Sequence, residues 1–194
     1  ALSNRGMDGD EVEDWQADEQ ERDDLAPSRD GEQEPARPWS GRGTPTRVVL
    51  VRHGVTAFTE QGRLDGRGGS DPDLTDAGRR QAQRAADLVA GLVGDDPVQV
   101  LTSDLARARQ TGAVIAERLG TAIEVDRDWD EQSFGDWDGA AVRDLVKDAA
   151  EDFRALRDDR GYARPGGESH DEMVERVLGA WERVVARGGT VVRS

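Results

Sequence analysis

The chain of 194 residues has no cysteine, and this absence excludes two kinds of structure. Without cysteine there is neither a disulfide framework nor a metal site built on thiolates. Long apolar runs are also lacking, since none approaches the roughly 20 residues of a membrane-spanning helix. The first residues do not contain the apolar core of a signal peptide. We therefore expect a cytoplasmic protein that does not insert into a membrane.

Basic residues are outnumbered in this sequence. There are 26 of them against 41 acidic residues, which gives a net charge of −15. Such an acidic balance argues against non-specific binding of nucleic acid. Lysine is almost absent, because Lys147 is the single lysine and the other 25 basic residues are arginines. A lone arginine is therefore a weak sign of function here.

The first 46 residues differ in composition from the rest. They carry 13 acidic residues and 5 arginines, so −8 of the net charge lies there. The segment has few large apolar side chains and no sustained periodicity, so it cannot bury enough surface to offset the entropy lost on ordering. We expect residues 1–46 to form a disordered acidic linker. Residues 47–194 are enough to form one domain with a real core.

Short apolar runs alternate with amphipathic segments through the rest of the chain. The apolar runs predict buried strands at 47–52, 98–101, 121–125 and 190–192. The amphipathic segments predict helices at 76–93, 104–119, 140–159 and 170–187, with a loop over 126–139. This alternation predicts an α/β domain of three layers, α/β/α, with a mainly parallel sheet.

Polar residues predict where the helices begin. Thr75 precedes the first helix, and Ser103 or Asp104 precedes the second. Ser169 and Glu172 have the spacing of a capping box before the last helix. The side chains expected to face inward from these three helices are Ala82, Ala85, Ala86, Val89, Leu92 and Val93; Leu105, Ala108, Gly112, Ile115 and Leu119; and Met173, Val177, Trp181, Val184 and Val185.

Arg52-His53-Gly54 follows the first predicted strand, at the carboxyl end where ligands bind in an open α/β sheet. Gly54 would let the backbone turn sharply and approach a ligand closely. The guanidinium of Arg52 matches phosphate oxygens in a bidentate fork, and a positive neighbour lowers the pKa of a histidine. A neutral His53 could then attack phosphorus. The tripeptide alone is equally compatible with a polar end to a strand.

A second basic group opens the helix that follows the second strand, in the sequence SDLARARQT. Arginines in the first turn of a helix oppose its macrodipole, at a cost of roughly 0.3–1 kcal/mol each. A bound anion would reverse this effect, because the helix N–H groups and the guanidinium would then face the same charge. Arg107 is the better candidate for such a role, whereas Arg109 fits a solvated side chain.

Five motifs occur in order over residues 47–193: VRHGVTAFTEQGRLDG, DPDLTDAGRRQA, SDLARARQT, DEQSFGDWDG and PGGESHDEM. Together they resemble the histidine phosphatase superfamily, whose members have a phosphoglycerate-mutase-like fold. The resemblance implies that His53 is the phosphorylated nucleophile and that Arg52 and Arg107 bind the phosphate. It also implies a substrate-side role for Arg63.

The same resemblance makes Glu131 the acid that protonates the leaving oxygen. A carboxyl group beside a phosphate dianion has its pKa raised toward the range that suits a general acid. Four aspartates crowd this loop, so a solvated acidic loop is the alternative, but the spacing before Phe134-Gly135-Asp136-Trp137 selects Glu131. His170 fits a polar residue at a helix start rather than a site residue.

Two positions depart from the pattern of the family. Thr59 stands where many members have asparagine, so the substrate contacts of that loop stay open. The second histidine of the family lies in a Ser-His-Gly motif after the last core strand, whereas this sequence ends in GGTVVRS. We expect a domain that is incomplete at its C-terminus and weakly active. The opening ALSNRGMDG faintly resembles the end of a ribonuclease H domain, as in bifunctional ribonuclease H/acid phosphatase-type proteins.

The residues and the resemblance predict a phosphomonoesterase of the acid phosphatase or ribazole-phosphate phosphatase type, acting on a small phosphorylated metabolite through a phosphohistidine. No cofactor is expected, and with no metal-ligand cluster the arginines would stabilise the transferred group. A phosphoglycerate mutase is the alternative within this fold, although the run between Arg109 and Glu131 leaves little room for an enclosing segment. A phosphate-binding module without turnover is the alternative from another class. The substrate and the oligomeric state stay open.

Overall fold

Four parallel strands form the centre of the fold in the computed structural model, which describes residues 45–194. Almost all of the segment expected to be a linker, residues 1–46, lies outside this range. The strands are β1 (Thr46–Leu50), β2 (Val98–Thr102), β3 (Ile123–Val125) and β4 (Gly189–Arg193). Their order in the sheet is β1-β4-β2-β3, so the strand that comes last in the sequence lies between the first two.

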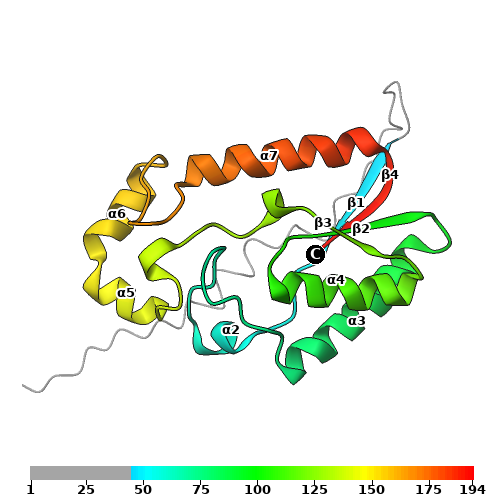
Figure 1. Cartoon of the computed structure of the whole chain (residues 1–194), viewed down its shortest axis with the longest axis horizontal. Helices are drawn as coiled ribbons and strands as arrows, with labels where there is room; N and C mark the ends of the chain where they lie inside the picture. The colour runs from blue at the N-terminus through cyan, green and yellow to red at the C-terminus, as the bar shows by residue number, and fades with distance from the viewer. Residues whose placement is uncertain (1–44) are drawn as a thin grey trace, which may run out of the picture. The chain divides into compact units, whose positions relative to one another are not determined.

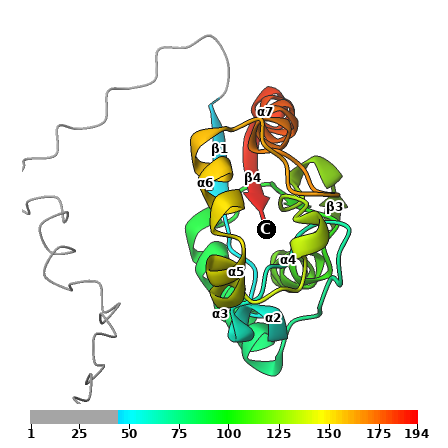
Figure 2. The same ribbon diagram turned by 90° about the vertical axis from the view of Figure 1, so that its left-hand side faces the viewer.

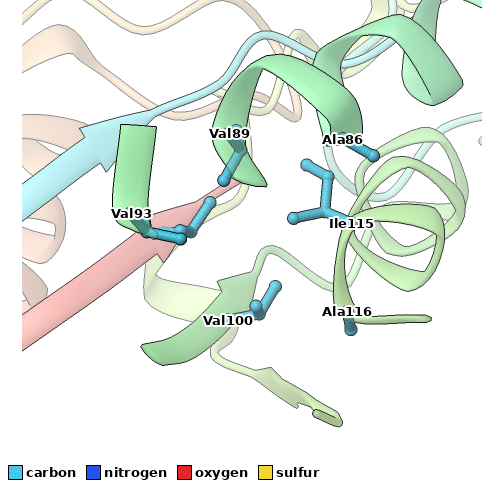
Figure 3. Close-up of a cluster of buried hydrophobic side chains, with 7 residues drawn as sticks. Ala86, Val89, Val93, Val100, Ile115 and Ala116 are labelled. Carbon is cyan, nitrogen blue, oxygen red and sulfur yellow. The ribbon is translucent and has the colours of Figure 1, made fainter. Parts of the chain in front are cut away.

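Helices cover both faces of this sheet (Figures 1 and 2). The helices α3 (Asp76–Val93) and α4 (Ala106–Leu119) lie on one side, and α7 (His170–Arg187) lies on the other. Successive side chains of β4 point to opposite faces of the sheet, so this strand contributes to a hydrophobic core on each face. Val192 belongs to the cluster formed with side chains of α3 and α4, whose members Val89 and Ile115 are labelled in Figure 3. Val191 points the opposite way and packs with α7. The three-layer α/β/α prediction is confirmed.

Shorter helices lie beyond the carboxyl ends of the strands (Figures 1 and 2). These are α2 (Ala57–Gln61), α5 (Val142–Asp148) and α6 (Ala150–Asp158). Two turns of 3₁₀-helix, η1 (Arg127–Trp129) and η2 (Gly135–Trp137), interrupt the segment predicted as a loop. The single helix predicted over 140–159 is wrong, because the backbone leaves the helical region at Ala149 and separates α5 from α6.

Two of the predicted helix starts are confirmed. The Thr75 hydroxyl accepts a hydrogen bond from the Gly78 N–H at the start of α3. Ser169 and Glu172 form the predicted capping box of α7, with a hydrogen bond in each direction. Both helices therefore begin where the local sequence places an N-cap.

The predicted cap of α4 is wrong. The helix begins after Leu105, and neither Ser103 nor Asp104 caps it with a side chain. The Asp104 carboxylate pairs instead with Arg127 at 2.8 Å. The first N–H group of α4 is bound instead by a loop residue distant in sequence, since Asp71 Oδ1 accepts a hydrogen bond of 2.8 Å from the Ala106 N–H.

The sequence predicts more inward-facing side chains on α3 and α7 than the structure buries. Leu92 of α3 and Trp181 and Val185 of α7 are exposed. Ala180 and Val184 are the fully covered residues of α7, one helical turn apart. A single helix resting on this face of the sheet buries only a narrow line of contact.

Candidate active site

A cavity of about 710 Å³ lies at the carboxyl ends of β1, β2 and β4. Its walls come from the end of β1, the first turn of α4, the chain after η1, the first half of α7 and the end of β4. Four of the five site residues named from the sequence line this cavity: Arg52, His53, Arg107 and Glu131. The topology thus brings together motifs that are up to 79 positions apart in the chain.

His53 is held in a defined tautomer. Its Nδ1 lies 2.8 Å from the Gly54 carbonyl oxygen, so Nδ1 carries the proton and donates it. Nε2 is then the basic nitrogen, and it accepts a hydrogen bond of 3.2 Å from Nε of Arg107. The ring therefore directs its lone pair toward an arginine inside the cavity.

The environment of His53 favours the neutral imidazole. Burial lowers its pKa from the usual 6.5, and the charges of Arg107 and Arg52 lower it further. The hydrogen bond to Gly54 and the carboxylate of Glu131 act in the opposite direction but do not reverse the shift. A neutral, oriented imidazole is the form of histidine that can act as a nucleophile.

Two glycines fix the backbone that carries His53. A Cβ atom on Gly54 would lie 2.3 Å from the Gly78 carbonyl oxygen, and one on Gly78 would lie 2.2 Å from the Val55 carbonyl oxygen. The close approach expected of Gly54 is thus made to the first turn of α3. The Gly54 N–H also donates to Thr111 Oγ1 of α4 at 3.2 Å. Helices α3 and α4 together hold this loop.

Arg107 is buried, with 3% of its surface exposed, and a carboxylate compensates its charge. Nη1 forms an ion pair of 2.9 Å with Asp65 Oδ2, and Nη2 donates to the Asp65 carbonyl oxygen at 2.8 Å. Burial raises the pKa of Asp65 and outweighs the opposing influence of Arg107. Sequence reasoning missed Asp65, although it lies in the first motif, two residues after Arg63.

Arg52 and Glu131 lie at the exposed rim of the cavity. Glu131 Oε1 accepts a hydrogen bond of 2.8 Å from the N–H of the next residue, Gln132. Its carboxylate is close enough to His53 to influence the pKa of the imidazole. A carboxylate and a fixed positive charge therefore share the cavity with the candidate nucleophile.

Arg63 does not reach the cavity. Its Nη1 donates to the Gly139 carbonyl oxygen at 2.7 Å, and its Nε donates to Gln61 Oε1 at 2.8 Å. The side chain thereby joins the end of α2 to the chain before α5. Arg109 also points away and pairs with Asp104 at 3.3 Å on an exposed surface, as its assignment to solvent predicted.

Thr59 and His170 have local roles at helix starts. Thr59 forms a capping box with Thr56 at the beginning of α2. His170 is the first residue of α7 and is exposed. Neither residue lines the cavity around His53.

A further arginine, Arg193, was not found from the sequence. It ends β4, lines the cavity, and stacks its guanidinium 4.9 Å from the centre of the Trp129 ring. Nη2 donates to the Trp129 carbonyl oxygen at 2.6 Å, while Nε is buried without a hydrogen-bond partner. The only sequence signal was a charge at the end of an apolar run.

Over residues 45–194, no group of three or more histidine, cysteine, aspartate or glutamate side chains could hold a metal ion. No helix in the same range is both long and apolar enough to cross a membrane. The arginines that line the cavity are Arg52, Arg107 and Arg193.

Comparison with known proteins places this geometry in a family. The sequence profile of the histidine phosphatase superfamily (branch 1) matches residues 48–192. A bifunctional protein of Mycobacterium tuberculosis, Rv2228c, is 38% identical over 157 residues, which are 79% of this chain and 42% of that protein. The adenosylcobalamin/alpha-ribazole phosphatase of Escherichia coli K12 is 33% identical over 144 residues, 73% of this chain and 66% of that protein.

A solved structure agrees with the sequence comparison. Mycobacterial glucosyl-3-phosphoglycerate phosphatase in complex with VO3 superposes with a TM-score of 0.66 and 31% identity, covering 76% of this chain and 73% of that chain. The chain spans less than half the length of the bifunctional relative. The resemblance inferred from the five motifs is confirmed: this chain belongs to the histidine phosphatase superfamily.

Proposed function

We propose that the chain is a phosphomonoesterase that transfers a phosphoryl group from a small ester to Nε2 of His53. The observation that carries this proposal is the hydrogen bond from Nδ1 to the Gly54 carbonyl oxygen, which leaves the lone pair of the ring on Nε2, beside Arg107. Phosphatases among the relatives support the same chemistry.

In the first step, Nε2 of His53 forms a bond to phosphorus while the bond to the ester oxygen breaks. Glu131 gives its proton to the leaving alkoxide, and the alcohol departs. Arg52 and Arg107 stabilise the charge on the transferred group, with Arg107 moving its Nε donor from His53 to a phosphate oxygen. In the second step Glu131 takes a proton from water, which attacks the phosphohistidine and releases inorganic phosphate.

The substrate class follows from the relatives rather than from the cavity. Two of them are named as a glucosyl-3-phosphoglycerate phosphatase and an alpha-ribazole phosphatase. Both names point to small phosphorylated metabolites as substrates of those proteins. We assign this chain the same broad class. Incubation with phosphoglycerates tests the mutase alternative, because a mutase would return the phosphoryl group to the acid instead of to water.

The test is labelling with a ³²P-phosphate ester, followed by rapid quenching. Wild-type chain should carry a label that is stable in base and lost in acid, as a phosphohistidine is. His53→Ala should carry none, whereas His170→Ala is the matched control and should label normally, since His170 is exposed at a helix start. Label that persists in His53→Ala would contradict the proposal.

A further inference from the structure

A buried ion pair lies next to the loop that carries Glu131. Arg176 of α7 donates from Nε and Nη2 to the two carboxylate oxygens of Glu168, at 2.9 and 2.8 Å. The two side chains are only 10% and 7% exposed. A bidentate pair with this geometry is the strong form of the arginine–carboxylate interaction.

The charges of this pair are well compensated. Burial acts to raise the pKa of Glu168, but the hydrogen bonds and charge of Arg176 outweigh it and hold the pKa below its usual value. Arg67 adds a second ion pair to Glu168 at 3.3 Å. Glu168 is therefore ionised at neutral pH and keeps its hold on Arg176.

The same pair fixes the backbone on both sides of Glu131. On the preceding side, Nη1 of Arg176 donates to the carbonyl oxygens of Asp128 and Asp130, both at 2.9 Å. On the following side, the Glu168 carboxylate accepts from the Ser133 N–H at 3.3 Å. The Glu168 carbonyl oxygen also accepts from Gln132 Nε2 at 2.8 Å.

Glu131 itself is exposed and depends on this backbone for its position. The hydrogen bond that orients its carboxylate comes from the N–H of its own neighbour, Gln132, at 2.8 Å. The location of the carboxylate therefore follows the placement of residues 130–133. A displacement of about 1 Å between a catalytic group and its target can lower turnover by about 10²-fold.

We propose that Arg176 and Glu168 are positioning residues for the reaction, which hold Glu131 where it can protonate the leaving oxygen. This inference rests on the acid role given to Glu131 in the proposed function. The first half of α7 lines the cavity. Through Arg176 the same helix would also set the position of Glu131 in the loop after η1.

Leaving-group dependence separates this role from a merely structural one. The p-nitrophenolate anion leaves without a proton, whereas the alkoxide of glycerol 2-phosphate needs one. Arg176→Lys retains a positive charge but loses the planar fork that reaches four acceptors. We expect it to lower the single-turnover rate of phosphohistidine formation about 10- to 10²-fold with glycerol 2-phosphate and less than about 3-fold with p-nitrophenyl phosphate. This rate is measured because the later hydrolysis step, in which Glu131 acts as a base, is the same for both substrates.

Three further variants complete the experiment. Glu168→Gln should show the same selectivity, and Glu131→Gln should show it more strongly. Arg187→Lys is the matched control, because Arg187 also lies on α7 and also forms a bidentate pair, with Glu124, but at the far end of the helix from the cavity. Arg187→Lys should leave the ratio of the rates with the two substrates unchanged.

The outcomes distinguish the two claims. If Glu131→Gln is selective but Arg176→Lys and Glu168→Gln lower phosphohistidine formation equally with both substrates, the positioning role is overturned while the proposed function stands. If Glu131→Gln lowers the rate of phosphohistidine formation equally with both substrates, its acid role is wrong and the positioning inference falls with it.

Discussion

At the scale of single residues, the chemistry of His53 is set by its two ring nitrogens and by the charges around them. One nitrogen donates to the Gly54 carbonyl oxygen, and the other meets Arg107. Asp65 compensates the positive charge of that arginine from the opposite side. His53, Arg107 and Asp65 therefore form a connected row, in which the charge of Arg107 helps to lower the pKa of His53 and opposes the burial that raises the pKa of Asp65.

The protonation of His53 gives the first prediction. Since burial and the two arginines lower its pKa, its titration midpoint should lie below 6.5, and the imidazole should be neutral at pH 7. Arg107→Met removes one positive charge and should raise the midpoint. Proton NMR of the ring resonances measures this directly, because the chain has only two histidines and His53→Ala assigns them. A midpoint above 6.5 in the wild-type chain would contradict the electrostatic account.

Asp65 gives the second prediction. Asp65→Ala leaves the buried guanidinium of Arg107 without its partner, and loss of one member of a buried pair costs about 3–5 kcal/mol in the free energy of unfolding. The exposed pair of Arg118 with Asp87 is the matched control, and Asp87→Ala should cost about 1 kcal/mol or less. Urea unfolding of both variants measures the difference. Equal costs would show that Asp65 does not stabilise Arg107.

At the scale of elements, the nucleophile loop is held by the close approach of two backbones. Gly54 and Gly78 leave no room for a Cβ atom between the chain after β1 and the first turn of α3. The helix starts and the strands around this contact could be predicted, because caps and apolar runs are local signals. The cap of α4 could not, since its carboxylate comes from Asp71, which is 35 positions away.

The third prediction concerns this contact. Gly78→Ala places a Cβ 2.2 Å from the Val55 carbonyl oxygen, so the loop of His53 must move. We expect phosphohistidine formation to fall by about 10² or more, as for a misplacement of about 1 Å. Gly91→Ala lies in the same helix with open space around it, and it should stabilise the protein by about 0.5–1 kcal/mol. Unchanged labelling in Gly78→Ala would show that the contact does not position His53.

At the scale of the whole described domain, the sheet order explains which site residues could be predicted from the sequence and which could not. The motifs identified the fold and four residues that meet in one cavity, because each motif is contiguous in the chain. The positions of Asp65, Arg193 and the Arg176–Glu168 pair could not be predicted. Their partners outside the pair are brought to them by packing between segments 35 or more positions apart, or by the insertion of β4 between β1 and β2.

The fourth prediction also belongs to this scale. The cavity gathers Arg52, Arg107 and Arg193, and residues 45–194 offer no cluster of side chains with which to hold a metal ion. Arginine charge should therefore suffice for phosphoryl transfer. Turnover of p-nitrophenyl phosphate should be the same with and without excess EDTA. A loss of turnover that added Mg²⁺ or Zn²⁺ restores would contradict this assignment.

The central claim is that Nε2 of His53 is the atom that receives the phosphoryl group. The most direct measurement is to label the chain with a phosphate ester, digest it under basic conditions and determine the isomer of phosphohistidine by ³¹P NMR and peptide mass spectrometry. The account predicts phosphate on the peptide that contains His53, attached to Nε2, because Nδ1 donates its proton to the Gly54 carbonyl oxygen. Phosphate attached to Nδ1, or located on His170 or on any other residue, would contradict it.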